Sequence, residues 1–251
     1  KEANGYGTLK DKVGGEKLKK IAFTKDNTAP TPYPLFICGV QVNSANAANF
    51  THGVLSGAVS YDNESKTLTL TNATLEAGDQ IAIDNQGIEQ LTIMLASGGN
   101  GVNELRCSKE DIPALKVAAR TRIKGDAKPG DPERRLDLGE NELLIENNLS
   151  IDHTMVMSQG FLRGGASPKP KLIVYGFGFR GKGLQNVGEL ALQMQASIIK
   201  PQGATFDPAT GSLSREGECE LGVKHYGLYF FNVQVTELNR NDLLAAAGFD
   251  A

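Results

Sequence analysis

The segment Thr67-Leu-Thr-Leu-Thr71 alternates threonine with leucine, and this alternation decides the fold class. Successive side chains of a β-strand point to opposite faces, so a period of two predicts a strand with one apolar and one polar face. Similar short runs follow at Ile81–Ile83 and Leu91–Leu95, each bounded by Gly, Asn or Asp. Almost nothing between such runs has room for a helix, and the sequence therefore predicts an all-β protein.

Further apolar and β-branched runs continue this pattern toward the C-terminus. An imperfect unit, consisting of alternating apolar residues and a polar corner, recurs about every 20 to 30 residues, which is typical of a β-solenoid whose strands stack coil upon coil. We therefore predict a single-stranded parallel β-helix with hairpin-like end pieces; a two-sheet β-sandwich is the alternative. The predicted strands are 115–118, 122–124, 143–145, 149–151, 155–157, 172–175, 190–199 and 228–235.

The two ends of the chain differ in composition from this repeating part. Residues 1–32 are polar and rich in Gly and Lys, and prolines at positions 30, 32 and 34 favour an extended connector. We predict a polar leader and linker over 1–32 and one β-solenoid domain over 33–251. The lysine-rich start suits a mature chain whose export signal has been removed, and equally a cytosolic protein. Asn241–Gly248 predicts a short helix that covers the open end of the solenoid.

Charge and cysteine usage exclude several classes of partner and site. The chain has 26 Lys and Arg against 29 Asp and Glu, a net charge of −3, so no overall basic field attracts nucleic acid or an anionic membrane. The cysteines Cys38, Cys107 and Cys219 lie far apart without a C-x-x-C pair, which argues against a zinc site. We interpret them as buried thiols, although their spacing does not settle whether they pair.

The stretch Lys171–Leu184, KLIVYGFGFRGKGL, carries three glycines at the G-x-G-x-x-G spacing of a dinucleotide fingerprint. That fingerprint requires a helix directly afterwards and an acidic residue about 20 residues further on. Two more glycines and an asparagine follow at 182–188, and no Asp or Glu lies between Glu189 and Asp207. We therefore predict no nucleotide binding, and interpret the stretch as a coil corner at which Gly176 and Gly178 let the chain turn.

Catalytic and metal-binding patterns are weak in this sequence. Glycoside hydrolysis needs paired carboxylates, but there is no Asp-Asp pair; of the polygalacturonase-like motifs only Arg122-Ile-Lys124 is present, and we interpret it as a solvent-facing strand. His52, His153 and His225 are isolated, without a second ligand at helical or strand spacing, and acidic residues do not cluster as calcium would require. The sequence therefore predicts no catalytic residue, no metal and no cofactor.

Aromatic residues beside polar ones are the expected platform for carbohydrate, because a ring can stack on the C–H face of a sugar. Two such groups occur, although half of each would face inward on a strand, and the absence of Trp weakens the case. Core filling is the alternative role for these rings. The candidate ligand-binding residues are Tyr175, Phe177, Phe179, Arg180, Tyr226 and Tyr229.

The segments Tyr33–Asn46, Gly57–Asp62 and Lys66–Leu75 resemble the start of exported gut-bacterial proteins described as carbohydrate-binding domain-containing. The match lies mainly over residues 33–75, and the following coils match loosely. The resemblance implies a right-handed β-helix, a place in the periplasm or on the outer cell surface, often as a lipoprotein, and a role in binding glycans. The family offers no catalytic residues to carry over.

These observations predict a non-catalytic exported protein that presents a β-solenoid surface to carbohydrate or to a cell-envelope partner. A polysaccharide-active enzyme of the β-helix type, either hydrolase or lyase, is one alternative. A structural or adhesin-like surface protein is another. Membrane contact is expected only through a lipid anchor on a removed N-terminal segment.

Overall fold

The computed structural model describes residues 29–96, 102–126, 134–213, 218–230, 233–236 and 240–241. The chain divides into two compact units, Lys1–Pro30 and Thr31–Ala251, and the following account concerns the second. Regular structure in these ranges consists of β-strands alone, and most of their pairings are parallel. The prediction of an all-β protein is confirmed.

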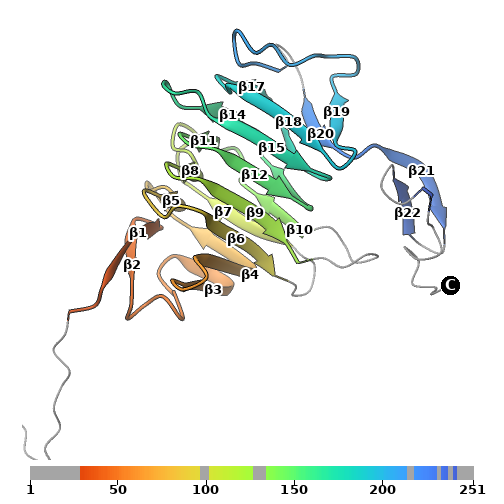
Figure 1. The fold of residues 1–251 in the computed structure, drawn as a ribbon. Coiled ribbons are helices and arrows are strands. Elements are labelled where there is room, and N and C mark those ends of the chain that lie inside the picture. The colour runs from red at the N-terminus through yellow and green to blue at the C-terminus, as the bar shows by residue number, and fades with distance from the viewer. Residues whose placement is uncertain are drawn as a thin grey trace, which may run out of the picture. The chain divides into compact units, whose positions relative to one another are not determined.

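The strands form three parallel series, each running through successive turns of the chain (Figure 1). Sheet A is one series, and sheet B contains the other two as its first and second arms. Sheet A holds β5 (Ile83–Asn85), β8 (Leu115–Val117), β11 (Leu143–Ile145), β14 (Phe161–Gly164) and β17 (Gly183–Gln185). The first arm holds β4 (Thr67–Glu76), β6 (Leu91–Ala96), β9 (Thr121–Gly125), β12 (Leu149–Asp152), β15 (Lys171–Tyr175) and β18 (Glu189–Gln193). The second arm holds the end of β4, then β7 (Val102–Arg106), β10 (Arg134–Asp137), β13 (Thr154–Met157) and β16 (Phe179–Gly181).

Consecutive strands of the chain visit sheet A, the first arm and the second arm in turn, so β8, β9 and β10 make one coil and β11, β12 and β13 the next. Each strand pairs in parallel with its counterpart one coil later; Leu143, for example, lies in register with Leu115 on one side and Leu162 on the other. This parallel pairing is solenoid-like. It differs from the antiparallel pairing expected of a β-sandwich.

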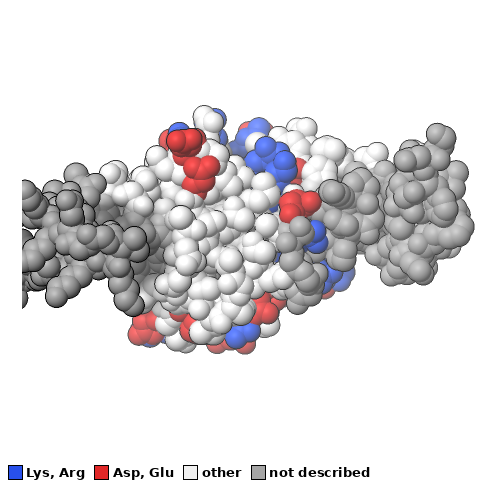
Figure 2. Space-filling view, turned by 90° about the horizontal axis from the view of Figure 1, so that it is seen from below, with Lys and Arg blue, Asp and Glu red and all other residues white. Residues whose placement is uncertain are grey.

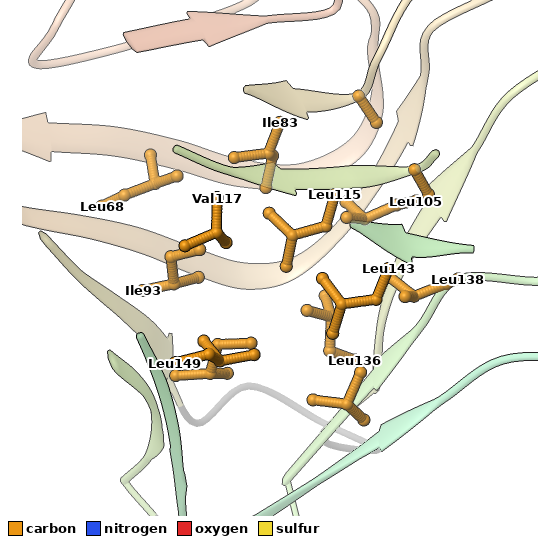
Figure 3. Packing of buried hydrophobic residues seen from close by; sticks show 14 of the residues in the cluster. Leu68, Ile83, Ile93, Leu105, Leu115, Val117, Leu136, Leu138, Leu143 and Leu149 are labelled. Atoms are coloured by element: carbon orange, nitrogen blue, oxygen red, sulfur yellow. The ribbon is translucent and has the colours of Figure 1, made fainter. Parts of the chain in front are cut away.

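The core lies between the three series and is built from equivalent residues stacked coil upon coil. Leu68 and Leu70 of the threonine–leucine segment have no exposed surface, whereas the three threonines of the segment are half-buried on the outer side. Leu68 is in register with Ile93, and Ile93 with Ile123, all completely buried. Figure 3 shows such side chains from both sheets pointing toward one another. The period of two thus separates core from surface, as predicted.

Antiparallel pieces cover both ends of the coil stack, which confirms the predicted hairpin-like ends. At the N-terminal end, β1 (Pro32–Ile37) pairs with β2 (Val40–Asn43) and with β5, and β3 (Val54–Asp62) pairs with β4. At the other end β20 (Cys219–Gly222) joins β16 to β19 (Ser197–Lys200). A further hairpin consists of β21 (His225–Phe230) and β22 (Val233–Thr236). Strands β1, β3 and β20 thus pair with edges of β5, β4 and β16 that would otherwise be open to other chains.

The predicted C-terminal helical cap, residues 241–248, lies outside the described ranges apart from Asn241, which is in a turn. No helix occurs within the residues that the structure describes.

The glycine-rich stretch forms a corner between β15 and β16. Gly176 adopts a φ of +71°, the left-handed region that glycine enters without strain. A Cβ on Gly178 would lie 2.5 Å from Cγ1 of Val174 and 2.9 Å from the carbonyl oxygen of Leu221, so no larger residue fits there. Strand β17 follows Gly181 where a dinucleotide site would need a helix. The prediction of a coil corner is confirmed.

Candidate functional site

A hollow of about 420 Å³ opens on the outer face of the first arm of sheet B. We call it the Tyr175 hollow, and its lining comes from successive coils. Arg122 lies on β9, Ser150 and Asp152 on β12, and Tyr175 on β15. His153 alone forms the corner between β12 and β13, and Met194 follows β18. The lining residues are Arg122, Ser150, Asp152, His153, Tyr175 and Met194.

The alternation of each strand explains why these side chains face outward. On β9, Thr121 and Ile123 are buried, so Arg122 and Lys124 between and after them point to the outer face. The parallel register then sets Lys124 beside Asp152, and Asp152 beside Tyr175. Since neighbouring strands lie about 4.8 Å apart, these three residues form one continuous row across three coils.

Asp152 is the organising residue of the hollow. Its side chain is only 6% exposed, and a carboxylate so deeply placed needs charged or hydrogen-bonding partners. One of its oxygens, Oδ2, accepts a hydrogen bond from Nη2 of Arg122 and forms an ion pair with it. The other, Oδ1, contacts Nδ1 of His153. Asp152 therefore holds the guanidinium and the imidazole on either side of itself.

His153 is held in its neutral form. Partial burial lowers the pKa of its imidazole, and the positive charges of Lys124 and then Arg122 lower that pKa further. Asp152 acts in the opposite direction, but Arg122 already balances its charge. Because a carboxylate only accepts hydrogen bonds, the proton of the neutral ring lies on Nδ1. Nε2 is then an acceptor on a ring that is 43% exposed.

The backbone of His153 is also unusual, because its φ of +49° lies in the left-handed region. Residues other than glycine are uncommon there, and asparagine is among those that tolerate it best. The equivalent corner in other coils is occupied by Asn72, Gly176 and Met194, whose φ angles are +47°, +71° and +50°. The left-handed conformation therefore turns the chain from the first arm to the second, and in this coil the turning residue also carries the imidazole.

Acidification should destabilise the wild-type chain more than its His153→Asn variant. Because folding lowers the pKa of His153 below its ordinary value of 6.5, the folded state binds fewer protons than the unfolded state near that pH. Stability that is present above pH 6.5 is therefore lost as the pH falls. Urea unfolding of both proteins at about pH 7.5 and about pH 5 measures the difference. Parallel losses of stability in the two proteins would contradict a neutral His153.

The residues predicted from the sequence as ligand-binding do not gather in one place. Tyr175 lines the hollow, and Phe177 is half-buried at the corner that follows it. Phe179 has no exposed surface and packs in the core, so its selection as a sugar platform is wrong: a buried ring offers no stacking face. Tyr226 and Tyr229 lie on β21, and their side chains are outside the described part of the structure.

Arg180, the remaining predicted residue, lines a second hollow of about 400 Å³ on the second arm. Its Nη2 lies 3.0 Å from Oε1 of Glu220, a carboxylate only 7% exposed. Lys200 and Glu218 form a further pair at 2.6 Å nearby. No aromatic residue lines this hollow, and these charges already have partners. It is therefore the weaker candidate for a carbohydrate site.

Of the six residues that line the Tyr175 hollow, the sequence interpretation selected only Tyr175 as ligand-binding; it missed Arg122, Ser150, Asp152, His153 and Met194. Arg122 was expected on a solvent-facing strand, which it is, but its partner Asp152 lies on a different coil. His153 was noted only as an isolated histidine without a second ligand, and Asp152 was not singled out. The adjacent pair Asp152-His153 next to a strand end was the available signal.

Other reactive groups do not add to the site. The three cysteines are free thiols; Cys38 and Cys219 are buried and Cys107 is half-buried. Burial is the main cause that raises the pKa of Cys38 and of Cys219 to about 12. Within the described ranges no group of three or more His, Cys, Asp or Glu residues is placed to hold a metal ion. The same ranges contain no helix long and apolar enough to cross a membrane.

On the face seen in Figure 2, charged side chains lie around a broad uncharged area. Acidic and basic groups lie close together there, so neither sign dominates this face.

Comparison of the chain with protein-family models, with curated proteins and with solved structures found no match.

Proposed function

We propose that this chain is a non-catalytic protein that binds carbohydrate at the Tyr175 hollow. The observation that carries the proposal is the placement of a half-buried aromatic ring beside hydrogen-bonding side chains in an open depression. A sugar can stack on Tyr175 while its hydroxyl groups bond to Arg122, Ser150 or the Nε2 of His153. Met194, whose side chain is 52% exposed, adds apolar surface at the rim.

The proposal includes a finer description of the fold and of its location. The coils wind as a single right-handed parallel β-helix, and the protein is exported to the periplasm or the outer cell surface. Right-handedness agrees with the strong general preference for right-handed connections between parallel strands of one sheet. Export is supported by the resemblance of residues 33–75 to exported carbohydrate-binding domain-containing proteins.

Replacing Tyr175 by alanine should weaken glycan binding at least about tenfold, or about 1.4 kcal/mol. A glycan array identifies ligands for the wild-type chain, and isothermal titration of the best ligand then compares the variants. The matched control is Phe161→Ala, which removes an outward aromatic ring from the same coil but on sheet A. Equal affinities of the wild type and Tyr175→Ala would move the binding site elsewhere. A chain that binds no glycan favours a structural or adhesive role.

A polysaccharide-active enzyme is the second candidate, and one observation favours it. A neutral imidazole whose Nδ1 is held by a nearly buried carboxylate is the arrangement of a general base, because its Nε2 can accept a proton at neutral pH. Incubation with acidic and neutral polysaccharides, followed by analysis of the products, tests it. We expect no turnover. Product formation by the wild type that disappears in His153→Asn would replace the non-catalytic proposal.

A further inference from the structure

We propose that the Tyr175 hollow selects acidic carbohydrate, with a uronate carboxylate bound by the exposed part of Arg122 in the hollow and by Lys124 next to it. This inference rests on the proposed function, because it names the class of glycan that the same site would take. Its basis is an imbalance of charge along the row that Lys124, Asp152 and Tyr175 form across the coils.

Arg122 and Asp152 neutralise each other, which leaves Lys124 as the excess charge. Arg122 offers Nη2 to Asp152, and its side chain is 48% exposed, so part of the guanidinium fork still faces solvent. Lys124 points to the same face two residues later on β9. None of the ion pairs among the described residues involves Lys124. An unpaired cation beside a paired one attracts a carboxylate.

The acidic residue nearest to Lys124 along the chain has a partner of its own. Asp126, just after β9, accepts a hydrogen bond of 2.7 Å from Nε of Arg134. The positive charge of Lys124 therefore stays available to a ligand. In agreement, Lys124 and Arg122 both disfavour protonation of His153 in spite of the Asp152 contact.

The geometry lets one ligand use both the ring and the cations. Lys124 and Tyr175 are separated by a single strand, which places their backbones about 10 Å apart. A sugar stacked on Tyr175 covers Asp152 and can direct a carboxylate toward Arg122 and Lys124. Asp152, being nearly buried and already paired, would not repel that carboxylate as an exposed acid would.

Titration of the full chain with oligogalacturonate and oligomannuronate, and with the methyl esters of both, tests this inference. The esters keep the sugar and remove its charge. We expect at least one acid to bind about tenfold more tightly than its ester, and this preference to shrink as added salt screens the charges. Lys124→Gln should abolish the preference. Lys116→Gln, which removes a lysine charge from the outer face of sheet A, should leave it unchanged.

The outcomes separate this inference from the proposed function. If the esters bind as tightly as the acids, the selectivity is overturned and carbohydrate binding stands. If the acids are preferred equally by Lys124→Gln and by the wild type, the assignment to Lys124 is overturned. If neither the acids and esters nor any glycan on the array binds, the proposed function itself fails.

Discussion

Replacing Leu143 by alanine should lower the free energy of unfolding by about 2 to 5 kcal/mol. Leu143 lies on β11, in the middle of sheet A, and has no exposed surface. Its neighbours in the stack are Leu115 and Leu162, which are also completely buried. Removal of its side chain leaves a cavity that the coils on both sides restrict from closing, because their backbones are fixed by parallel pairing. Urea unfolding monitored by circular dichroism gives the change.

The control for this substitution is Leu55→Ala. Leu55 is on β3 with 62% of its side chain exposed, so the same chemical change should alter stability by less than about 0.5 kcal/mol. Similar losses in the two variants would contradict the assignment of the core to the space between the sheets.

Alanine at Gly164 should destabilise the protein by about 1 to 3 kcal/mol or more. A Cβ at this position would lie 2.1 Å from the carbonyl oxygen of Asn186 and 2.8 Å from its carbonyl carbon. Both atoms belong to the backbone just after β17, in the next coil, so no side-chain rotation relieves the contact. The side chain of Asn186 also donates from Nδ2 to the carbonyl oxygens of Gly164 and Gly165, and these bonds would be disturbed. Thermal unfolding followed calorimetrically measures the loss.

Gly87→Ala is the matched control and should have the opposite sign. The nearest atom to a Cβ there is Cβ of Pro34 at 3.4 Å, an ordinary contact, and the φ of Gly87 is not left-handed. Alanine at such a site stabilises by about 0.4 to 1 kcal/mol, because it restricts the unfolded chain. If Gly164→Ala were tolerated as well as Gly87→Ala, the close approach of β14 to residue 186 would be contradicted.

The strands of the first arm and the strands β5, β8 and β11 of sheet A were predictable, because their core positions are apolar and alternate, whereas β14 and β17 of sheet A were not predicted. The predicted run 143–145 is β11, and the run 91–95 is β6 to within one residue. Strands of the second arm were harder to find. β7 and β10 bury Asn103 and Arg134, so their pattern does not read as apolar and polar alternation. Their burial depends on partners from other coils, which the local sequence does not contain.

The predicted strand 190–199 is two strands, β18 and β19, separated by a turn. Met194 and Gln195 adopt φ of +50° and +62° there, a conformation that local sequence signals only when glycine or asparagine is present. The chain turns here because this position is the corner between the two arms of sheet B, as in the other coils. The conformational preferences of Met194 and Gln195 do not cause the turn. Met194 consequently lies at the rim of the Tyr175 hollow, a place that no alternation pattern predicts.

The candidate site was predictable for Tyr175 alone. Tyr175 is the last residue of β15, just before a glycine corner, and local alternation is sufficient to place its ring on the outer face. Arg122 and Asp152 are far apart in sequence and come together because β9 and β12 are adjacent in exact register. A change of coil length by one residue would place Asp152 on the inner face. Since coil lengths are irregular, the sequence alone does not fix which residues of different coils meet.

The stacking of coils has a consequence for how such a protein can change over evolutionary time. Each coil pairs only with the coil before and after it, so whole coils can be gained or lost without redesign of the remainder. The Tyr175 hollow does not share this freedom, because Arg122, Asp152, Tyr175 and Met194 come from four consecutive coils. Duplication or deletion within that block would separate the ring from its polar partners. The ligand recognition proposed for this hollow would therefore require these four coils to stay consecutive, whereas folding alone does not.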